Sequence, residues 1–395
     1  MKRIVYADNA ATTPVSREVI DAMTPCFEEI WGNPSSLHAK GRDAKDVLDD
    51  ARERIAKVLG CRASEIYFTS GGTESDNWAI RGAAKRMLAK GRDHIVTSKI
   101  EHHAVLHTCE ALEAEGFKVS YVGVDEDGIV DLDELKKVVT EKTAVVAIMY
   151  ANNEIGTIEP IEEIAKIAHS KGALMFTDAV QAVGNIDIDL SSLEVDMLAI
   201  SGHKIHAPKG IGLLYIKRGT VISNLIEGGG QESRKRGGTE NLPYIVGLAR
   251  ALEIAKERLP ELSRVERMRD RLIQELTKIP YSKLNGHRTK RLAGNVNIGF
   301  EFIEGESLLL WLDIAGICAS TGSACSTASL EPSHVLIATG VPHEKAHGSL
   351  RLSISHETTD EDIDYIIENV PSIVEKLRNM SPLWEEIVKK DAIKA

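Results

Sequence analysis

Two reactive side chains follow directly after segments whose apolar, β-branched composition predicts buried strands. Lys204 ends the run Ser201-Gly202-His203-Lys204, after the predicted strand 196–200. Asp178 follows the predicted strand 173–177, with Gln181 three residues later. In open α/β sheets, ligands bind outside the carboxyl ends of the strands. We therefore expect these side chains to lie at one edge of a sheet.

Each residue has an ordinary interpretation as well as a chemical one. A desolvated lysine forms a Schiff base with a carbonyl compound, whereas an isolated Lys204 would be a solvated loop residue. A carboxylate such as Asp178 can pair with a protonated pyridine nitrogen and make the ring an electron sink. Asp is also a common helix N-cap.

A glycine-rich turn follows a third predicted strand, 66–69. Gly71-Gly72-Thr73 leads into a helix, and such a turn exposes N–H groups that bind anions; a plain turn with a cap is the alternative. Ser201 and His203 are small or donor groups that suit a phosphate. A phosphate site, a carboxylate and a lysine together meet the needs of pyridoxal 5′-phosphate.

Two further residues follow strands in the same way. His102, after the predicted strand 94–98, could stack on a cofactor ring and move protons, because histidine titrates near neutral pH. A solvated residue at a helix start is the alternative. Asn153, after the predicted strand 143–149, could hydrogen-bond a ring substituent.

A candidate nucleophile lies far along the chain. Cys325 occupies a stretch of small polar residues, 320–329, which indicates an exposed loop and an accessible thiol; an inert surface cysteine is the alternative. Arg351 suits a substrate carboxylate, and its alternation with Leu350 and Leu352 directs it away from the core face, so an exposed strand arginine is equally consistent.

The elements that must position these residues alternate between strand and helix patterns. Besides the strands above, runs at 118–122 and 211–216 predict strands, and helical periodicity covers 44–59, 104–115, 131–140 and 160–170. This alternation predicts an α/β fold with a mainly parallel seven-stranded sheet covered by helices. The alternation of strand and helix patterns changes after about residue 255. We expect a large domain at 15–255 and a smaller α/β domain, built from 1–14 and 256–395, that carries the cysteine loop.

Composition limits the classes of protein. The 395 residues include 48 Lys and Arg against 59 Asp and Glu, a net charge of −11 that argues against binding to nucleic acid or anionic membranes. No apolar run reaches the ~18 residues that span a bilayer, and Asp8 interrupts any signal-like start. Five cysteines are too few for a disulfide framework. A cytoplasmic enzyme is expected.

Taken together, the chain resembles the class V, fold-type I enzymes that use pyridoxal phosphate, and within them the cysteine desulfurases of the NifS/IscS group. The resemblance runs from about Tyr6 to Trp384. It rests on the following segments: Ala7-Asp8-Asn9-Ala10-Ala11-Thr12-Thr13, Gly32-Asn33-Pro34, Thr73-Glu74-Ser75-Asp76-Asn77, Glu101-His102, Asn152-Asn153-Glu154-Ile155-Gly156, Asp178-Ala179-Val180-Gln181, Ser201-Gly202-His203-Lys204, Arg236-Gly237-Gly238-Thr239 and Gly322-Ser323-Ala324-Cys325.

The resemblance implies a role for each matching residue. Lys204 would form the aldimine with the cofactor, Cys325 would carry a persulfide, and His102 would be the ring-stacking acid and base. Asp178 would pair with the pyridine nitrogen. The remaining residues implied to bind the cofactor are Gln181 and Asn153 at the ring, and Gly72, Thr73, Ser201, His203 and, across a homodimer interface, Thr239 at the phosphate. Asn33 and Arg351 would hold the substrate carboxylate.

The implied activity converts L-cysteine to L-alanine and delivers the sulfur to an acceptor. Ser381-Pro382-Leu383-Trp384 resembles the ending of the branch that serves iron–sulfur scaffold proteins, where Cys325 could share a cluster as a metal ligand with its partner. Transfer to tRNA thiolation is also open. The alternative function is a class V aminotransferase on the same scaffold, which would not need Cys325. His356-Glu357 departs from the Gly-Arg that relatives often have, and Gly72 stands where many have Ala.

Overall fold

A mixed seven-stranded sheet organises the larger part of the molecule, in a computed structural model that describes residues 3–321 and 331–385. The strand order is β2-β8-β7-β6-β5-β3-β4. The strands are β2 (Ile66–Thr69), β3 (His94–Ser98), β4 (Lys118–Val122), β5 (Thr143–Ala147), β6 (Leu174–Asp178), β7 (Met197–Ser201) and β8 (Gly212–Ile216). Strands β3 to β7 run parallel, and β8 is antiparallel to both of its neighbours. The predicted mainly parallel seven-stranded sheet is confirmed.

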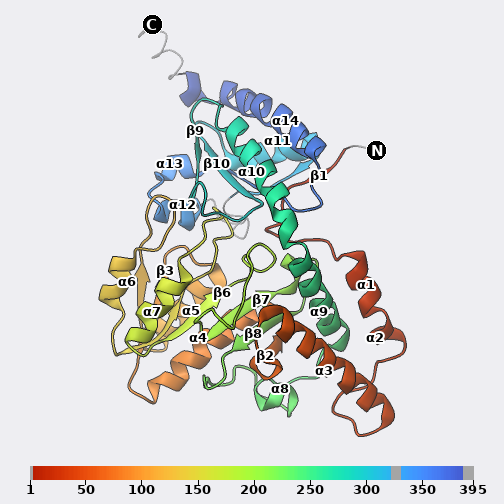
Figure 1. Ribbon diagram of the computed structural model, residues 1–395. Coiled ribbons are helices and arrows are strands. Elements are labelled where there is room, and N and C mark those ends of the chain that lie inside the picture. Colours follow the sequence, from red (N-terminus) through yellow and green to blue (C-terminus); the bar gives the residue numbers. More distant parts are fainter. Residues whose placement is uncertain (1–2, 322–330, 386–395) are drawn as a thin grey trace.

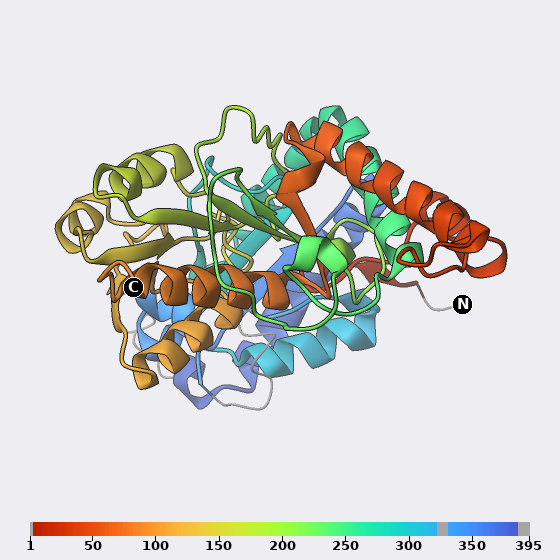
Figure 2. The same cartoon turned by 90° about the horizontal axis from the view of Figure 1, so that it is seen from below.

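Helices cover both faces of this sheet (Figures 1 and 2). They are α1 (Arg17–Met23), α2 (Pro25–Glu28), α3 (Ala39–Leu59), α4 (Gly72–Leu88), α5 (His103–Ala114), α6 (Leu132–Val138), α7 (Ile161–Ser170), α8 (Gln231–Arg234) and α9 (Leu242–Glu257). Successive strand residues point to opposite faces. Leu198 therefore packs in the cluster with α3, α7 and α9, and Ala199 packs in the cluster with α4 and α5. Burial on both sides explains why the strands have continuous apolar sequences.

A second, smaller α/β unit packs above the carboxyl edge of the sheet (Figure 1). Its antiparallel sheet has the order β12-β10-β9, from β9 (Ser282–Leu284), β10 (Asn295–Phe300) and β12 (Ser349–Ser353). Its helices are α10 (Leu262–Leu276), α11 (Gly305–Ala315), α12 (His334–Ala338), α13 (His343–Ala346) and α14 (Asp360–Asn379). The chain start joins this unit, because β1 (Val5–Tyr6) pairs in parallel with β11 (Ile317–Cys318). Val5 and Ala7 share its hydrophobic core.

Several element ends differ from the sequence prediction by one or two residues. Asp178 and Ser201 are the last residues of β6 and β7 rather than the first residues beyond them. The reason is that both take part in the ladder: Asp178 pairs with Ala199, and Ser201 pairs with Gly212. Helix α4 begins at Gly72, within the glycine-rich turn that was expected to precede it. Among the helices that the structure describes, none is long and apolar enough to cross a membrane.

Candidate active site

A cavity of about 550 Å³ opens at the carboxyl edge of the central sheet. The turn after β2 lines one end of it, and the ends of β6 and β7 line its floor. Ten of the residues singled out from the sequence line this cavity: Gly72, Thr73, His102, Asn153, Asp178, Gln181, Ser201, His203, Lys204 and Arg351. Residues separated by more than 200 positions therefore converge on one space.

Lys204 lies at the end of a single 3-10 turn, Gly202–Lys204, that follows β7. Its ammonium group donates hydrogen bonds of 2.7 Å to the carbonyl oxygens of Ala10 and Ala11. The amine is thus held at the cavity wall by the N-terminal segment. A lysine fixed in this position can meet a ligand in the cavity.

Asp178 is buried at the cavity floor, where its Oδ1 accepts a hydrogen bond of 2.9 Å from the backbone N–H of Val180. Burial raises the pKa of this carboxyl group to about 6, and the positive charge of Lys204 opposes that rise. The amine and the carboxyl group are therefore close enough to interact, as a site combining the two requires.

A second carboxyl group, for which no role was predicted from the sequence, lines the same cavity. Asp76 on α4 is 1% exposed, and its Oδ1 has no hydrogen-bond partner among the described residues. Burial and the negative charges of Asp178 and Glu101 raise the pKa of Asp76 well above its usual value. The signal in the sequence was a charged residue among the apolar positions of α4.

His102 is the N-cap of α5, and its Nδ1 accepts a hydrogen bond of 3.1 Å from the N–H of Ala104. In the neutral ring, the proton is consequently on Nε2. Burial, aided by the charges of His103 and Lys204, lowers the pKa of His102 to about 4. His102 is thus a capping residue, and it lines the cavity at the same time.

The phosphate-sized end of the cavity is formed by the start of α4 and the end of β7. A Cβ atom at Gly72 would lie 2.8 Å from Cγ2 of Val180 and 3.5 Å from Cβ of Ser201, so the backbone is closely packed there. Thr73 follows in the first turn of the 17-residue helix α4, where N–H groups point toward a bound anion. His203 is held by a contact of 3.1 Å between its Nδ1 and Oγ1 of Thr12.

Arg351 is not an exposed strand residue. It is 2% exposed, and its guanidinium group donates hydrogen bonds of 3.0 Å to Oδ1 of Asp8 and 3.1 Å to the carbonyl oxygen of Asn153. Its Nε has no hydrogen-bond partner among the described residues. An unsatisfied donor on a buried cation that lines the cavity is suited to binding a carboxylate.

Three expected residues are not brought together in the described part of the structure. Asn33 does not line the cavity, and its Oδ1 accepts a hydrogen bond of 2.9 Å from the N–H of Ser35. Thr239, between α8 and α9, does not line the cavity either. Cys325 lies outside the described residues. Within those residues, no group of three His, Cys, Asp or Glu side chains is placed to hold a metal ion.

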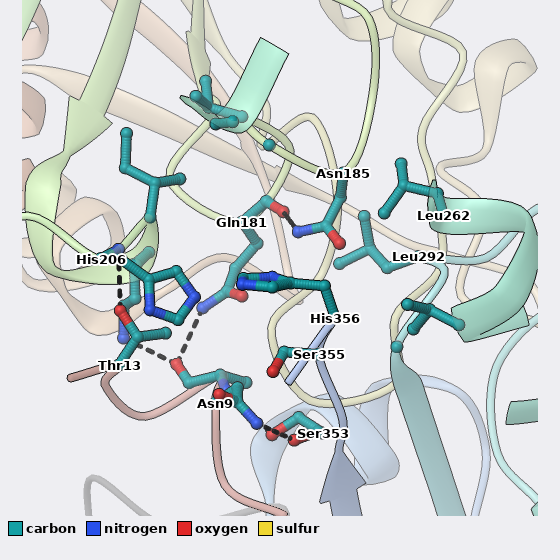
Figure 3. A pocket seen from close by; sticks show the side chains of 18 of the residues that line it. Asn9, Thr13, Gln181, Asn185, His206, Leu262, Leu292, Ser353, Ser355 and His356 are labelled. Carbon is teal, nitrogen blue, oxygen red and sulfur yellow. Dashed lines mark hydrogen bonds between the residues drawn. The ribbon is translucent and has the colours of Figure 1, made fainter. Parts of the chain in front are cut away.

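A second cavity, of about 110 Å³, lies on the other side of Lys204, between the two units of the molecule. Figure 3 shows the rings of His206 and His356 side by side in its lining, in edge-to-face contact with centroids 4.9 Å apart. His356 also contacts the guanidinium group of Arg258. Burial, together with that positive charge, lowers the pKa of His356 to about 4. The departure at His356 therefore changes this second cavity, since His356 is not among the residues lining the larger one.

The residues of the larger cavity fit pyridoxal 5′-phosphate. The start of the 17-residue helix α4 lines one end of the cavity and can bind a phosphate through its N–H groups, and Asp178 offers a buried carboxyl group for the ring nitrogen. The amine of Lys204 lies at the same cavity, and the unsatisfied Nε of Arg351 is available to a substrate carboxylate.

Comparisons with known proteins agree with this geometry. A family model described as aminotransferase class-V matches residues 5–366. A cysteine desulfurase IscS of Methanosarcina thermophila is 56% identical over 382 residues, covering 96% of this chain and 94% of the relative. A cysteine desulfurase IscS of Clostridium botulinum is 52% identical over 393 residues, covering 98% and 99%.

Solved structures with a similar fold include a NifS-like protein and a protein in complex with cysteine. A structure titled NifS-like protein has a TM-score of 0.89 and 42% identity, covering 95% of this chain and all of that chain. A structure titled SspA in complex with cysteine has a TM-score of 0.77 and 35% identity, covering 88% of this chain and 98% of the other. The similarity extends across both units of the fold.

Proposed function

Because this chain belongs to the class V aminotransferase family, we propose that it is a pyridoxal-phosphate-dependent cysteine desulfurase that moves the sulfur of L-cysteine onto Cys325. The observation that carries the proposal is the convergence of Lys204, Asp178, His102 and Arg351 on one cavity. The relatives above, which are named cysteine desulfurases over nearly the whole chain, support the choice of substrate.

When bound, the cofactor supplies an electron sink for charge that develops at the substrate Cα. Lys204 holds the cofactor through its amine and afterwards removes the Cα proton. Asp178 is ionised when it faces a protonated ring nitrogen, because the two opposite charges stabilise each other in a buried site. Gln181 and Asn153, which line the same cavity, would contact the ring.

His102 would lie against the cofactor ring, and in its neutral form it carries a proton on Nε2, the nitrogen that its capping bond leaves available. Gly72, Thr73, Ser201 and His203 bind the phosphate, and Thr239 of a second copy of the chain completes that site. Arg351 orients the substrate through its carboxylate. The resemblance gives Asn33 the same role, although Asn33 does not line the cavity of its own chain.

The sulfur transfer step uses Cys325 as nucleophile. Its thiolate attacks the substrate sulfur, an S–S bond forms, and the Cβ–S bond breaks with its electron pair remaining on carbon, where a proton is added. In sum, L-cysteine and the Cys325 thiol give L-alanine and a Cys325 persulfide. An acceptor thiol or an iron–sulfur scaffold protein then takes the sulfur, and Cys325 as a shared cluster ligand is part of the same proposal.

Mass spectrometry of the peptide that contains Cys325 tests this assignment. After exposure to L-cysteine, we expect the mass of one added sulfur atom on that peptide, and L-alanine in solution. The Cys325→Ser variant should bind the cofactor with an unchanged absorbance spectrum and form neither product. Normal L-alanine formation by that variant would show that another group is the nucleophile. Keto-acid formation in place of L-alanine would indicate an aminotransferase.

The proposal extends to the organisation of the protein. Residues 15–255 form the cofactor-binding domain, and residues 1–14 with 256–395 form the small domain; the separate hydrophobic clusters support this division. The active form is a homodimer. A cytoplasmic location is proposed because the sparse cysteines suit a reducing compartment.

A further inference from the structure

Glu154 is a buried carboxyl group that the reaction proposed above does not use. Its side chain is 5% exposed, and its Oε2 accepts a hydrogen bond from the hydroxyl group of Ser333. The Ser333 hydroxyl oxygen in turn accepts from the N–H of Leu336, 3.2 Å away, as the N-cap of α12. Because a hydroxyl group has one proton, Ser333 can give it to Glu154 while capping the helix.

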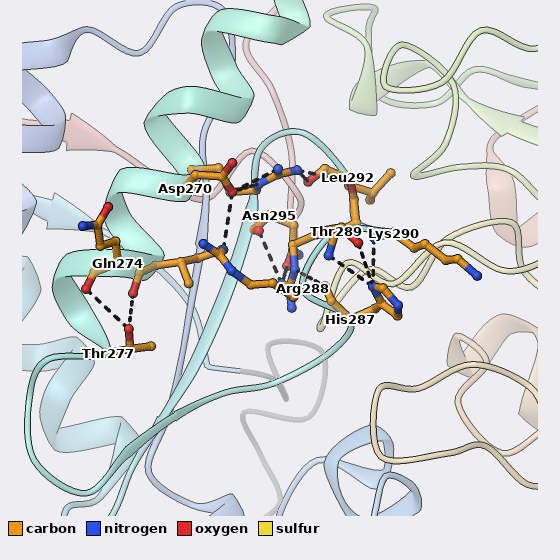
Figure 4. A network of polar contacts seen from close by, with 12 residues as sticks. Asp270, Gln274, Thr277, His287, Arg288, Thr289, Lys290, Leu292 and Asn295 are labelled. Carbon is orange, nitrogen blue, oxygen red and sulfur yellow. Dashed lines mark hydrogen bonds and ion pairs between the residues drawn. The ribbon is translucent and has the colours of Figure 1, made fainter.

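The backbone of Glu154 is fixed equally firmly. Its carbonyl oxygen accepts hydrogen bonds from the side-chain amides of Asn295, at 3.2 Å, and Asn297, at 3.1 Å, both on β10. Figure 4 shows Asn295 within a network of polar contacts, where its Oδ1 accepts a hydrogen bond of 3.0 Å from Arg291. These two hydrogen bonds fix the backbone of Glu154. The hydrogen bond from Ser333 holds its carboxyl group.

The cation that influences this carboxyl group is Arg351. Asn297 is the register partner of Arg351 across β10 and β12, and Asn153, next to Glu154, accepts a hydrogen bond from Arg351. The other groups that bond to Glu154, from β10 and α12, are uncharged. Arg351 is already paired with Asp8. An ionised Glu154 thus places a second negative charge near one buried cation.

We propose that Glu154 is a positioning residue that couples binding of the substrate carboxylate at Arg351 to the uptake of one proton. This inference rests on the proposed function, since it takes Arg351 as the carboxylate site. An incoming carboxylate brings a third negative charge to the surroundings of Arg351, where Asp8 forms an ion pair with the guanidinium group and an ionised Glu154 interacts with it over a longer distance. Adding a proton to Glu154 removes one of these negative charges while keeping the contact with Ser333.

Glu154 changes its protonation state in the pH range where such coupling can be measured. Burial raises the pKa of Glu154 to about 7, while the Ser333 hydrogen bond and the charge of Arg351 hold it down. A bound carboxylate raises that pKa further. Below pH 7 the proton is already present, so affinity is independent of pH. Above pH 7 a proton must be taken up, and affinity falls by up to tenfold per pH unit.

The test uses propionate, which has the carboxylate but neither the amine nor the thiol of L-cysteine and stays ionised over the pH range examined. Its inhibition constant against L-cysteine is measured from pH 6 to pH 8.5 on the cofactor-loaded enzyme. For the native protein we expect a flat region below pH 7 and a rise of about tenfold by pH 8. Glu154→Gln keeps an acceptor for Ser333 but cannot ionise, so its inhibition constant should equal the native value at pH 6 and stay flat.

A pH-independent inhibition constant in the native protein, or an equal slope in Glu154→Gln, would overturn the proposal. A purely structural role would change the melting temperature of Glu154→Gln without altering the slope. A second measurement needs no variant: a pH indicator should report about three quarters of a proton taken up per site when propionate saturates the native enzyme at pH 7.5, and zero uptake would also overturn it.

Arg351→Gln separates failure of this inference from failure of the proposed function. If that variant binds the cofactor but no longer binds propionate, Arg351 is the carboxylate site, and the Glu154 result stands or falls by itself. If propionate inhibits Arg351→Gln as it inhibits the native protein, the assignment of Arg351 is wrong, and the coupling fails with it.

Discussion

Buried carboxyl groups are the chemically unusual residues of this protein. Asp76, Glu101, Glu154 and Asp178 all have raised pKa values, and in each of them burial is the largest cause. Removing a carboxylate from water is costly unless cations or hydrogen-bond donors compensate. Around the cavity such compensation is incomplete in the described structure, which leaves these groups ready to respond to a charged ligand.

Glu159 allows this principle to be tested away from the cavity. Its Oε2 accepts a hydrogen bond of 3.0 Å from the N–H of Val130, and its Oε1 has no hydrogen-bond partner among the described residues. Burial, with a smaller contribution from the charge of Asp125, raises the pKa of Glu159 to about 8. Between its normal pKa near 4.5 and pH 8, the folded state therefore holds a proton that the unfolded state has lost.

The native free energy of unfolding should consequently fall as the pH rises through this range, by about 1 kcal/mol per pH unit from Glu159. Glu159→Gln resembles the protonated acid and removes this contribution. We expect its stability relative to the native protein to increase steadily from pH 6 to pH 8, as measured by urea unfolding. A difference between the two proteins that is constant with pH would contradict the raised pKa.

At the scale of elements, the starts of two helices line part of the cavity. Helix α4 begins at Gly72 directly after the turn that follows β2, and α5 begins after its N-cap His102. The partial positive charge of a helix start favours a negative ligand group. The parallel strands place these two helix starts at the same edge of the sheet, so that one ligand can reach both.

Thr73, in the first turn of α4, is the side chain to change at this scale. Thr73→Val keeps the shape and removes the hydroxyl group that we expect to donate to the cofactor phosphate. The dissociation constant of pyridoxal phosphate, measured by absorbance, should rise about ten- to a hundredfold, since a hydrogen bond to a charged group contributes about 1.5–3 kcal/mol. Thr73→Ser is the matched control and should bind the cofactor as the native protein does. Equal affinities for all three proteins would remove Thr73 from the phosphate site.

At the scale of the whole molecule, the cavity depends on segments far apart in the chain. The N-terminal segment closes it by accepting the hydrogen bonds of Lys204, and it belongs to the core of the small unit through Val5 and Ala7. Thr239 does not line the cavity of its own chain. That absence is consistent with its proposed place in the site of a second copy.

Mixed dimers test this arrangement. Lys204→Ala and Thr239→Val are combined as differently tagged subunits and assayed at a limiting concentration of pyridoxal phosphate. If Thr239 acts across the interface, one site of the mixed dimer has neither substitution, and we expect about half of the native activity. Activity no greater than half that of the Thr239→Val dimer would place Thr239 in the site of its own chain. A solution mass of 43.2 kDa, rather than twice that value, would exclude the dimer.

The sequence by itself determined the class of fold and about half of the residues that line the cavity. Strand runs such as 66–69 and 94–98 are local patterns, because a strand buried on both faces needs apolar residues at every position. Lys204, Asp178 and His102 could be selected for the same reason: each lies at or beside the end of such a run, and parallel strands end at a common edge.

Only the tertiary structure decided the electrostatics of the site. Alternation along β12 left Arg351 with an exposed alternative, and its burial follows from a pairing with Asp8, 343 residues earlier in the chain. Asp76 and Glu154 were plain members of quoted segments until packing removed them from water. Desolvation and charge–charge energies depend on distances between residues remote in sequence, and no local pattern of residue types contains those distances.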